Sequence, residues 1–156
     1  MITEERITNY ILDYLEENGW KILCFDYPQS GTGIYFKDEN FLNNKNKNSI
    51  NPDIIVTKDK ISLYFENKSY YYEPDVDLIK KLKKLNPYRK SIDRKLKETK
   101  NTVFFYGVGL PYTLDNENKV RELVRNDEID FAALVISSKK ILWYDFNEYN
   151  WYIFFK

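Results

Sequence analysis

The stretch NPDIIVTKDKISLYFENK, residues 51–68, decides the fold of this chain. Its two apolar runs predict two β-strands that are joined by a tight polar turn at residues 58–60. Because strand side chains alternate between the two faces of a sheet, those at 61, 63 and 65 share one face. Glu66 and Lys68 share the other face, so an acid and a lysine lie next to each other at the end of an apolar hairpin.

The same hairpin brings a second acid to this end of the sheet. A turn at residues 58–59 predicts that Asp53 lies opposite Tyr64 and diagonal to Glu66. Diagonal neighbours are about 7–8 Å apart, which is close enough for two carboxylates to share one cation. The sequence therefore predicts that these two acids and Lys68 converge.

Two carboxylates and a lysine suit the cleavage of a phosphodiester. Mg²⁺ prefers oxygen ligands and is commonly held by one or two carboxylates, water and substrate phosphate. The bound metal makes a water nucleophilic near neutral pH and offsets charge on the phosphate. A neighbouring lysine holds that water or stabilises the charge that develops on the phosphate. Asp53, Glu66 and Lys68 are thus candidates for a minimal nuclease site.

Pro52-Asp53, a short turn and then Glu66-Asn67-Lys68 resemble the signature of the PD-(D/E)xK nuclease superfamily. That superfamily includes type II restriction endonucleases, archaeal Holliday-junction resolvases and several repair and recombination nucleases. The order of the flanking elements is similar as well. A helix that ends at Gly19, an early strand and a Ser/Gly loop precede the motif, as they do in many members.

The resemblance implies a role for each residue of the motif. Asp53 and Glu66 would bind the metal, the main-chain carbonyl of Asn67 would be a further ligand, and Lys68 would be the catalytic lysine. Mg²⁺ is the implied cofactor, with Mn²⁺ as a substitute. Each half of the motif also has a structural explanation. Pro-Asp favours the turn before a strand, and Glu-x-Lys at a strand end forms an ion pair on a solvated face.

Many members of the superfamily also carry a glutamate on the first helix, near the metal. Here Thr3 is the predicted N-cap of a helix that ends before Gly19. Glu4 lies on the same stripe as the apolar residues at 7 and 11, and Glu5 lies beside it, so either is a candidate accessory acid. The usual glutamate-to-glycine spacing falls instead on Thr8, which is not acidic. Alternatively, both acids only stabilise the helix N-terminus through its dipole.

Composition narrows the chemistry further. The chain has 156 residues, which predicts one domain, and 43% of them are hydrophobic. It has no histidine, which excludes Ser-His triads and histidine metal sites, and its one cysteine, Cys24, excludes an intramolecular disulfide. No run approaches the roughly 20 apolar residues that span a bilayer, and the first residues lack the features of a signal peptide. We expect a cytoplasmic protein without a membrane association.

The formal net charge is zero, but charge is unevenly distributed along the chain. Residues 80–100 contain ten Lys and Arg against two acids. Such cations bind phosphates by displacing condensed counterions, so the segment is predicted to hold a DNA backbone. The candidate contacts are Lys80, Lys81, Lys83, Lys84, Arg89, Lys90, Arg94 and Lys95. The alternative is a solvated, lysine-rich helix surface.

Two loops before the hairpin are further candidates for DNA contact. Ser30 lies in the loop 29–33, and in the Holliday-junction resolvases a serine in this loop assists catalysis. The alternative for Ser30 is an ordinary hinge before a strand at 34–36. The stretch 38–51 is rich in Asn and Lys and predicts an exposed loop. Asn side chains read adenine edges, but AT-rich coding also produces such stretches.

The remaining pattern predicts alternating strands and helices in a single nuclease-like domain, residues 1–156. Helices are expected at 75–85, 88–98 and 116–125, and strands at 20–25, 102–110, 131–137, 140–146 and 149–155. The expected fold class is α/β, a restriction-endonuclease-like core with a central mixed β-sheet flanked by helices. The motif hairpin would lie at the centre of that sheet.

The expected function is a Mg²⁺-dependent DNA endonuclease of the restriction type that acts on double-stranded DNA. A homodimer is expected, because cuts in two antiparallel strands need two sites related by a twofold axis. A Holliday-junction resolvase or a recombination or repair nuclease of the same superfamily is the first alternative. A non-catalytic DNA- or partner-binding module with this fold is the second, and an unrelated α/β domain is the third.

Overall fold

The computed structural model describes residues 2–27, 30–38 and 49–145. Within these ranges the chain forms four helices and nine strands. In chain order they are α1 (Glu4–Glu17), β1 (Lys21–Tyr27), β2 (Ser30–Gly31), β3 (Phe36–Lys37), β4 (Ser49–Ile50), β5 (Ile54–Lys58), β6 (Ile61–Asn67), α2 (Glu73–Lys84), α3 (Arg89–Leu96), β7 (Val103–Pro111), α4 (Leu114–Arg125), β8 (Phe131–Ser137) and β9 (Lys140–Asp145).

A mixed sheet of seven strands organises the described part of the chain, in the order β2-β1-β5-β6-β7-β8-β9. β6, β7 and β8 are parallel, and the other neighbouring pairs are antiparallel. β3 and β4 pair separately. The prediction that the motif hairpin lies at the sheet centre is confirmed, since β6 is the middle strand.

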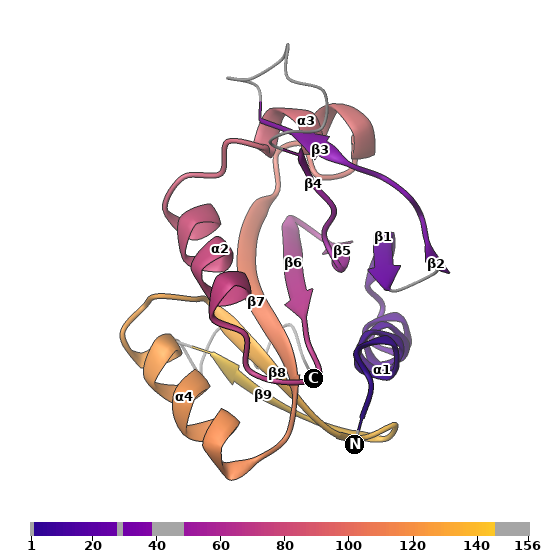
Figure 1. Cartoon of the computed structure of the whole chain (residues 1–156). Helices are drawn as coiled ribbons and strands as arrows, with labels where there is room; N and C mark the ends of the chain where they lie inside the picture. Colours follow the sequence, from indigo (N-terminus) through magenta and orange to yellow (C-terminus); the bar gives the residue numbers. More distant parts are fainter. Residues whose placement is uncertain (1, 28–29, 39–48, 146–156) are drawn as a thin grey trace.

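Helix α1 covers one face of the sheet (Figure 1). Its N-terminus is capped as predicted, because Thr3 Oγ1 accepts a hydrogen bond of 3.2 Å from the Arg6 N–H. Gly19 follows the helix with φ of 85°, a conformation that glycine adopts without a Cβ penalty. The residues that this face buries include Ile7, Ile11 and Leu15 of α1 and Leu63 and Phe65 of β6.

Helices α2, α3 and α4 cover the opposite face (Figure 1). α2 and α3 connect β6 to β7, and α4 connects β7 to β8, which are the long crossovers that parallel strands require. The buried residues of this face include Val76, Ile79, Ile92 and Val120 of the helices and Tyr64 and Val108 of the sheet. Leu63 and Phe65 thus face α1 while Tyr64 faces α2, so the predicted alternation along β6 is confirmed.

The register of the motif hairpin differs from the prediction. Ile54 pairs with Phe65, so the next position places Asp53 beside Glu66 rather than opposite Tyr64. The predicted register was wrong because the turn is centred one residue later, at residues 59–60. Its first residue, Asp59, adopts φ of 56°, which Asp tolerates better than most residues. The two acids are therefore closer neighbours than a diagonal pair.

The other predicted elements within the described ranges agree with the structure to within two residues at each end. The loop 29–33 contains the short strand β2, and residues 49–50 of the predicted loop 38–51 form β4. The strand predicted at 149–155 and most of the loop 38–51 lie outside the described residues. None of the helices in the described ranges combines the length and apolarity that crossing a bilayer requires.

Candidate functional site

The predicted acids meet at the edge of the sheet where the parallel strand β6 ends. Asp53 immediately precedes β5, and Glu66 is the penultimate residue of β6. Helices α1 and α2 both begin at this edge (Figure 1). Ligands of open α/β sheets bind outside the carboxyl ends of the strands, so this edge is a suitable place for a binding site.

Asp53 and Glu66 form a hydrogen-bonded carboxyl pair. Burial raises the pKa of Asp53 to about 7, against the hydrogen bond from the Asn67 N–H, and the charge of Glu4 adds to the rise. Burial also raises the pKa of Glu66 well above its usual range, and the charge of Asp53 reinforces this. Two carboxyls held this close do not ionise independently, so the pair retains a proton near neutral pH.

Tyr64 orients the second acid from within the core. Its hydroxyl donates a hydrogen bond of 3.0 Å to Glu66 Oε1, and its side chain is fully buried. Burial and the Glu66 charge raise the pKa of this phenol well above its usual range, so the hydroxyl keeps its proton and remains a donor. The sequence analysis missed this role, although the two residues share a face two positions apart on one strand.

Asn67 connects the carboxyl pair to α1. Its N–H donates to Asp53 Oδ2 over 2.7 Å, and its side-chain Nδ2 donates to Oγ1 of the buried Thr8 over 3.0 Å. Gly109 of β7 leaves room for this amide, because a Cβ at 109 would lie 2.2 Å from Asn67 Oδ1. Thr8, the position at which the superfamily spacing expects an acid, therefore holds Asn67 in place.

Lys68 points into the same pocket as Glu66. Its N–H donates to the Gly109 carbonyl over 3.0 Å, and its Nζ lies 3.8 Å from Glu4 Oε2. Burial disfavours the ammonium form, but the charges of Glu4 and Asp75 outweigh this effect and raise the pKa of Lys68. The lysine is therefore a full positive charge at neutral pH, beside a carboxyl pair that shares a proton.

Of the two candidate accessory acids, the structure brings Glu4 to the site. Burial raises the pKa of Glu4, the charge of Lys68 opposes the rise, and the charge of Asp75 adds to it. Glu5 is exposed and forms no ion pair within the described residues. The sequence left both acids open as accessory candidates; Glu4 extends the buried face of the helix, as its place on the apolar stripe indicated, and Glu5 does not.

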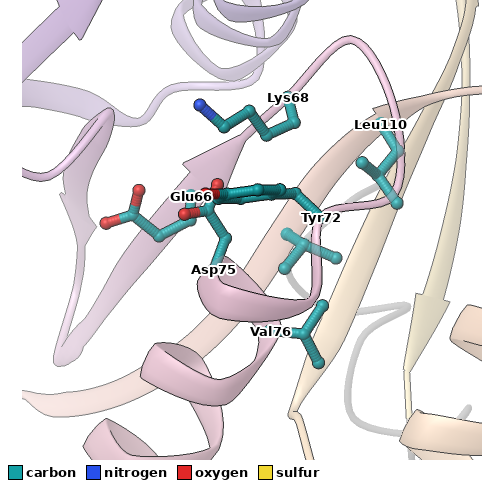
Figure 2. Close-up of a pocket in the computed structure, with 7 residues that line it drawn as sticks. Glu66, Lys68, Tyr72, Asp75, Val76 and Leu110 are labelled. Carbon is teal, nitrogen blue, oxygen red and sulfur yellow. The ribbon is translucent and has the colours of Figure 1, made fainter.

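Asp75 and Tyr72 complete the site, and the sequence analysis missed both. They line one small pocket with Glu66, Lys68, Val76, Val108 and Leu110 (Figure 2). Burial raises the pKa of Asp75, and the charge of Lys68 opposes this. The short connection between the motif and the next helix was the feature of the sequence that could have indicated these two residues. Only residues 69–72 separate Lys68 from α2, so the helix has to begin at the edge where β6 ends.

The basic segment lies mostly away from this edge. α2 begins at the candidate site and leads away from it, and α3 lies at the opposite end of the sheet (Figure 1). Arg89 of α3 donates to the carbonyls of Thr99 and Thr102, just before β7 begins. Because β6 and β7 run parallel in register, α3 is separated from Lys68 by roughly the length of β6, about 20 Å.

At least half of the predicted phosphate contacts have partners within the protein. These pairs are Lys80 with Glu128, Lys83 with Asp127 and Asp130, Arg89 with Asp93, and Lys95 with the Tyr35 carbonyl. Lys81, Lys84 and Lys90 are exposed and form no ion pair within the described part of the chain, and Arg94 is exposed as well. The exposed cations are the side chains most accessible to an external phosphate.

The serine candidate lies beyond β1 in the sheet. Ser30 belongs to β2, whose backbone pairs with Tyr27 at the end of β1, and β1 separates it from β5. Cys24 of β1 is buried, and burial raises the pKa of its thiol to about 12, so it remains a packed thiol.

In residues 2–27, 30–38 and 49–145, no group of three or more His, Cys, Asp or Glu side chains is arranged to hold a metal ion. The carboxyl pair provides only two such side chains, Asp53 and Glu66, which is fewer than a group of this kind contains. Comparisons with protein-family models, with curated proteins and with solved structures find no match to this chain. The motif and the geometry of the site are therefore the features that bear on function.

Proposed function

We propose that this protein is a Mg²⁺-dependent DNA endonuclease of the restriction type, with Asp53, Glu66 and Lys68 as its catalytic residues. One observation carries the proposal. A carboxyl pair that shares a proton adjoins a charged lysine at the edge where β6 ends. Two acids in such contact destabilise a fold at neutral pH, whereas a divalent cation between them would offset both charges.

The donor set fits a hard divalent cation. Tyr64 and the Asn67 N–H each bind one oxygen of the carboxyl pair, and a metal held by Asp53 and Glu66 would take the place of the proton that the two acids share. The main-chain carbonyl of Asn67 is the third donor that the motif implies. Mg²⁺, or Mn²⁺ in its place, would supply an activated water and offset charge on the phosphate.

The protein's own groups account for the rest of the chemistry. The Lys68 ammonium is charged and faces the pocket, where it would stabilise the negative charge that develops on the phosphate or hold the attacking water. Glu4 pairs with that ammonium and opposes its movement away from the site. The Asn67 N–H fixes Asp53.

The proposal includes a restriction-endonuclease-like core. Its support is the arrangement that the resemblance implies, with α1 and β1 before the motif hairpin and that hairpin at the centre of a mixed sheet with helices on both faces. The exposed Lys81, Lys84 and Lys90 are the proposed backbone contacts. A cytoplasmic homodimer is the proposed active form, because one site cuts one strand.

A cleavage assay tests the function. Purified protein is incubated with unmethylated plasmid, linear duplex and a four-way junction, with Mg²⁺, with Mn²⁺ and with EDTA. The matched variants are Lys68→Ala at the site and Lys60→Ala in the turn of the same hairpin, where the lysine is exposed. We expect discrete duplex fragments from the wild type and from Lys60→Ala, and none from Lys68→Ala or in EDTA.

Other outcomes select between the alternatives. Cleavage confined to the junction would assign a resolvase with the same catalytic residues. DNA binding without cleavage under either metal would refute the enzyme and leave a binding module. Sedimentation of the active fraction with and without duplex tests the homodimer, which a single monomeric species under both conditions would exclude.

A further inference from the structure

The position of the Lys68 ammonium is only partly explained by its ion pair. The main chain of this residue is fixed by the hydrogen bond to Gly109, but the amine lies at the end of a flexible four-carbon stem. Its ion-pair partner among the described residues is Glu4, at 3.8 Å, and the two side chains are 28% and 25% exposed. Ion pairs of this length and exposure restrain a lysine weakly.

The ring of Tyr72 supplies a second contact. Lys68 Nζ lies 5.1 Å from the centroid of this ring, within the range of a cation–π interaction. Figure 2 shows the Lys68 side chain along one side of the ring, and the hydroxyl end of the ring turned toward Glu66 and Asp75. The ring therefore forms a wall of the pocket on which the ammonium lies.

The main chain of Tyr72 is fixed by the helix that it precedes. Its carbonyl accepts hydrogen bonds from the N–H groups of Asp75 and Val76, at 3.2 and 3.3 Å, so it is fixed to the first turn of α2. Val76 is 2% exposed and anchors that turn in the core. The ring of Tyr70 packs edge-on against the ring of Tyr72 at 5.8 Å. The Tyr72 ring therefore projects from a main chain that is fixed to α2 and packs against a neighbouring ring.

We infer that Tyr72 is a positioning residue for Lys68, and that its ring keeps the ammonium in the pocket beside Glu66. The ring, and not the hydroxyl, carries the effect, because a cation is attracted to the face of any aromatic ring. The effect of Tyr72 on cleavage rests on the proposed function. Its effect on the order of the Lys68 side chain is independent of that function.

The test compares three variants of the full chain. Tyr72→Phe keeps the ring, and Tyr72→Leu removes it. Tyr112→Leu is the matched control, since Tyr112 is 37% exposed against 38% for Tyr72 and its ring carries no lysine ammonium from the described residues. Thermal melting first establishes that all three fold. The ¹³C relaxation of the Lys68 ε-methylene, assigned from the spectrum of Lys68→Ala, then reports the order of the side chain without DNA or metal.

We expect Tyr72→Leu to lower the order of the Lys68 ε-methylene to that of the exposed Lys60, while the other two variants match the wild type. Cleavage kinetics should show kcat lower by about tenfold in Tyr72→Leu alone, with KM within about twofold, because a misplaced group affects the chemical step more than binding. A purely packing role would lower stability without this division between kcat and KM.

Two results would overturn the inference. One is unchanged order of the lysine in Tyr72→Leu. The other is an equal loss in Tyr72→Phe, which would assign the effect to the hydroxyl. If the wild type cleaves no nucleic acid, the proposed function fails, but the relaxation measurements still decide whether Tyr72 positions Lys68.

Discussion

The two ends of β6 accommodate polar side chains in opposite ways. At its start, Ser62 Oγ and Thr102 Oγ1 are 2.7 Å apart, and Thr57 Oγ1 donates to the Ile61 carbonyl over 2.9 Å. Each of these side-chain hydroxyls therefore has a hydrogen-bond partner. At its end, Asp53 and Glu66 place two acids in contact, and burial raises the pKa of both.

The two ends of β6 differ in what their polar groups do for stability. The hydroxyls at its start stabilise the fold, whereas the acids at its end do not, so a function has to account for them. A satisfied network of hydroxyls and carbonyls adds rigidity and one defined arrangement to the core. A pair of buried acids costs stability at neutral pH, and local conflicts of this kind are expected at functional sites. The four predictions below test this division, beginning with the largest expected effect.

Substitution at the acid end should remove cleavage, and substitution at the hydroxyl end should not. We expect Asp53→Ala, Glu66→Ala and Lys68→Ala each to lower the cleavage rate by at least about 100-fold, because each removes a group that acts on the reacting phosphate. Ser62→Ala serves as the control and should retain the wild-type rate per folded molecule. Full cleavage by any of the three would remove that residue from the site.

Gly109→Ala should destabilise the fold strongly. The new Cβ would lie 2.2 Å from Asn67 Oδ1 and 2.6 Å from Ile11 Cδ1, which forces α1 and β6 to shift. We expect a loss of about 3 kcal/mol in the free energy of unfolding, measured by urea denaturation. Gly33→Ala is the comparison, since it meets no atom within 4 Å and adds only strain at φ of 68°. A loss in Gly109→Ala no larger than that in Gly33→Ala would contradict the expected cost of the close packing at 109.

The carboxyl pair should make the protein more stable in mild acid. The folded-state pKa of Asp53 is about 7 against an ordinary value of 3.8, so the folded state binds this proton more tightly than the unfolded state. Its contribution is complete below about pH 4 and is lost as the pH rises through about 7, with a size of the order of 4 kcal/mol. Denaturation midpoints between pH 4.5 and 8.5 measure it.

Asp53→Asn is the control for this pH dependence. It should flatten the difference in stability between pH 4.5 and 8.5, and raise the stability of the protein at the higher pH. Added Mg²⁺ should stabilise the wild type at pH 8.5 and leave Asp53→Asn unchanged. Parallel pH profiles for the two proteins would show that Asp53 does not hold the proton.

Arg89→Met should lower stability without affecting cleavage. Arg89 Nε lies 3.0 Å from both carboxyl oxygens of Asp93, and its guanidinium lies 4.6 Å from the centroid of the Phe104 ring. Since Arg89 is partly exposed, we expect a loss of about 2 kcal/mol in the free energy of unfolding. Lys90→Met, at the neighbouring exposed position, should be neutral in the same denaturation assay. A cleavage defect in folded Arg89→Met would extend the site to α3.

The sequence predicted the elements and the faces of β6 well, because both depend on local patterns. Alternation placed Glu66 and Lys68 on one side, and helical periodicity favoured Glu4 over Glu5 as the inward acid. The register of the hairpin was missed because it depends on the backbone conformation of Asp59, which residue type alone favours weakly.

The sequence predicted less of what surrounds the motif. Tyr72 and Asp75 join the site through the packing of α2 on the sheet, a tertiary arrangement that periodicity within the helix does not specify. The same limitation applies to the basic segment. Its charge was visible in the sequence, but Lys83 pairs with Asp127 and Asp130, which are far away along the chain, and only the fold reveals such pairs.

For the proposed endonuclease, the length of β6 also sets a scale for the duplex that it would bind. About 20 Å separates Lys68 from the end of the sheet that carries α3. B-form DNA advances about 3.4 Å per base pair, so roughly six base pairs fit between a phosphate at the pocket and one bound by Lys90. A duplex that extends less than about half a helical turn to that side of the cut would reach the acids without reaching α3.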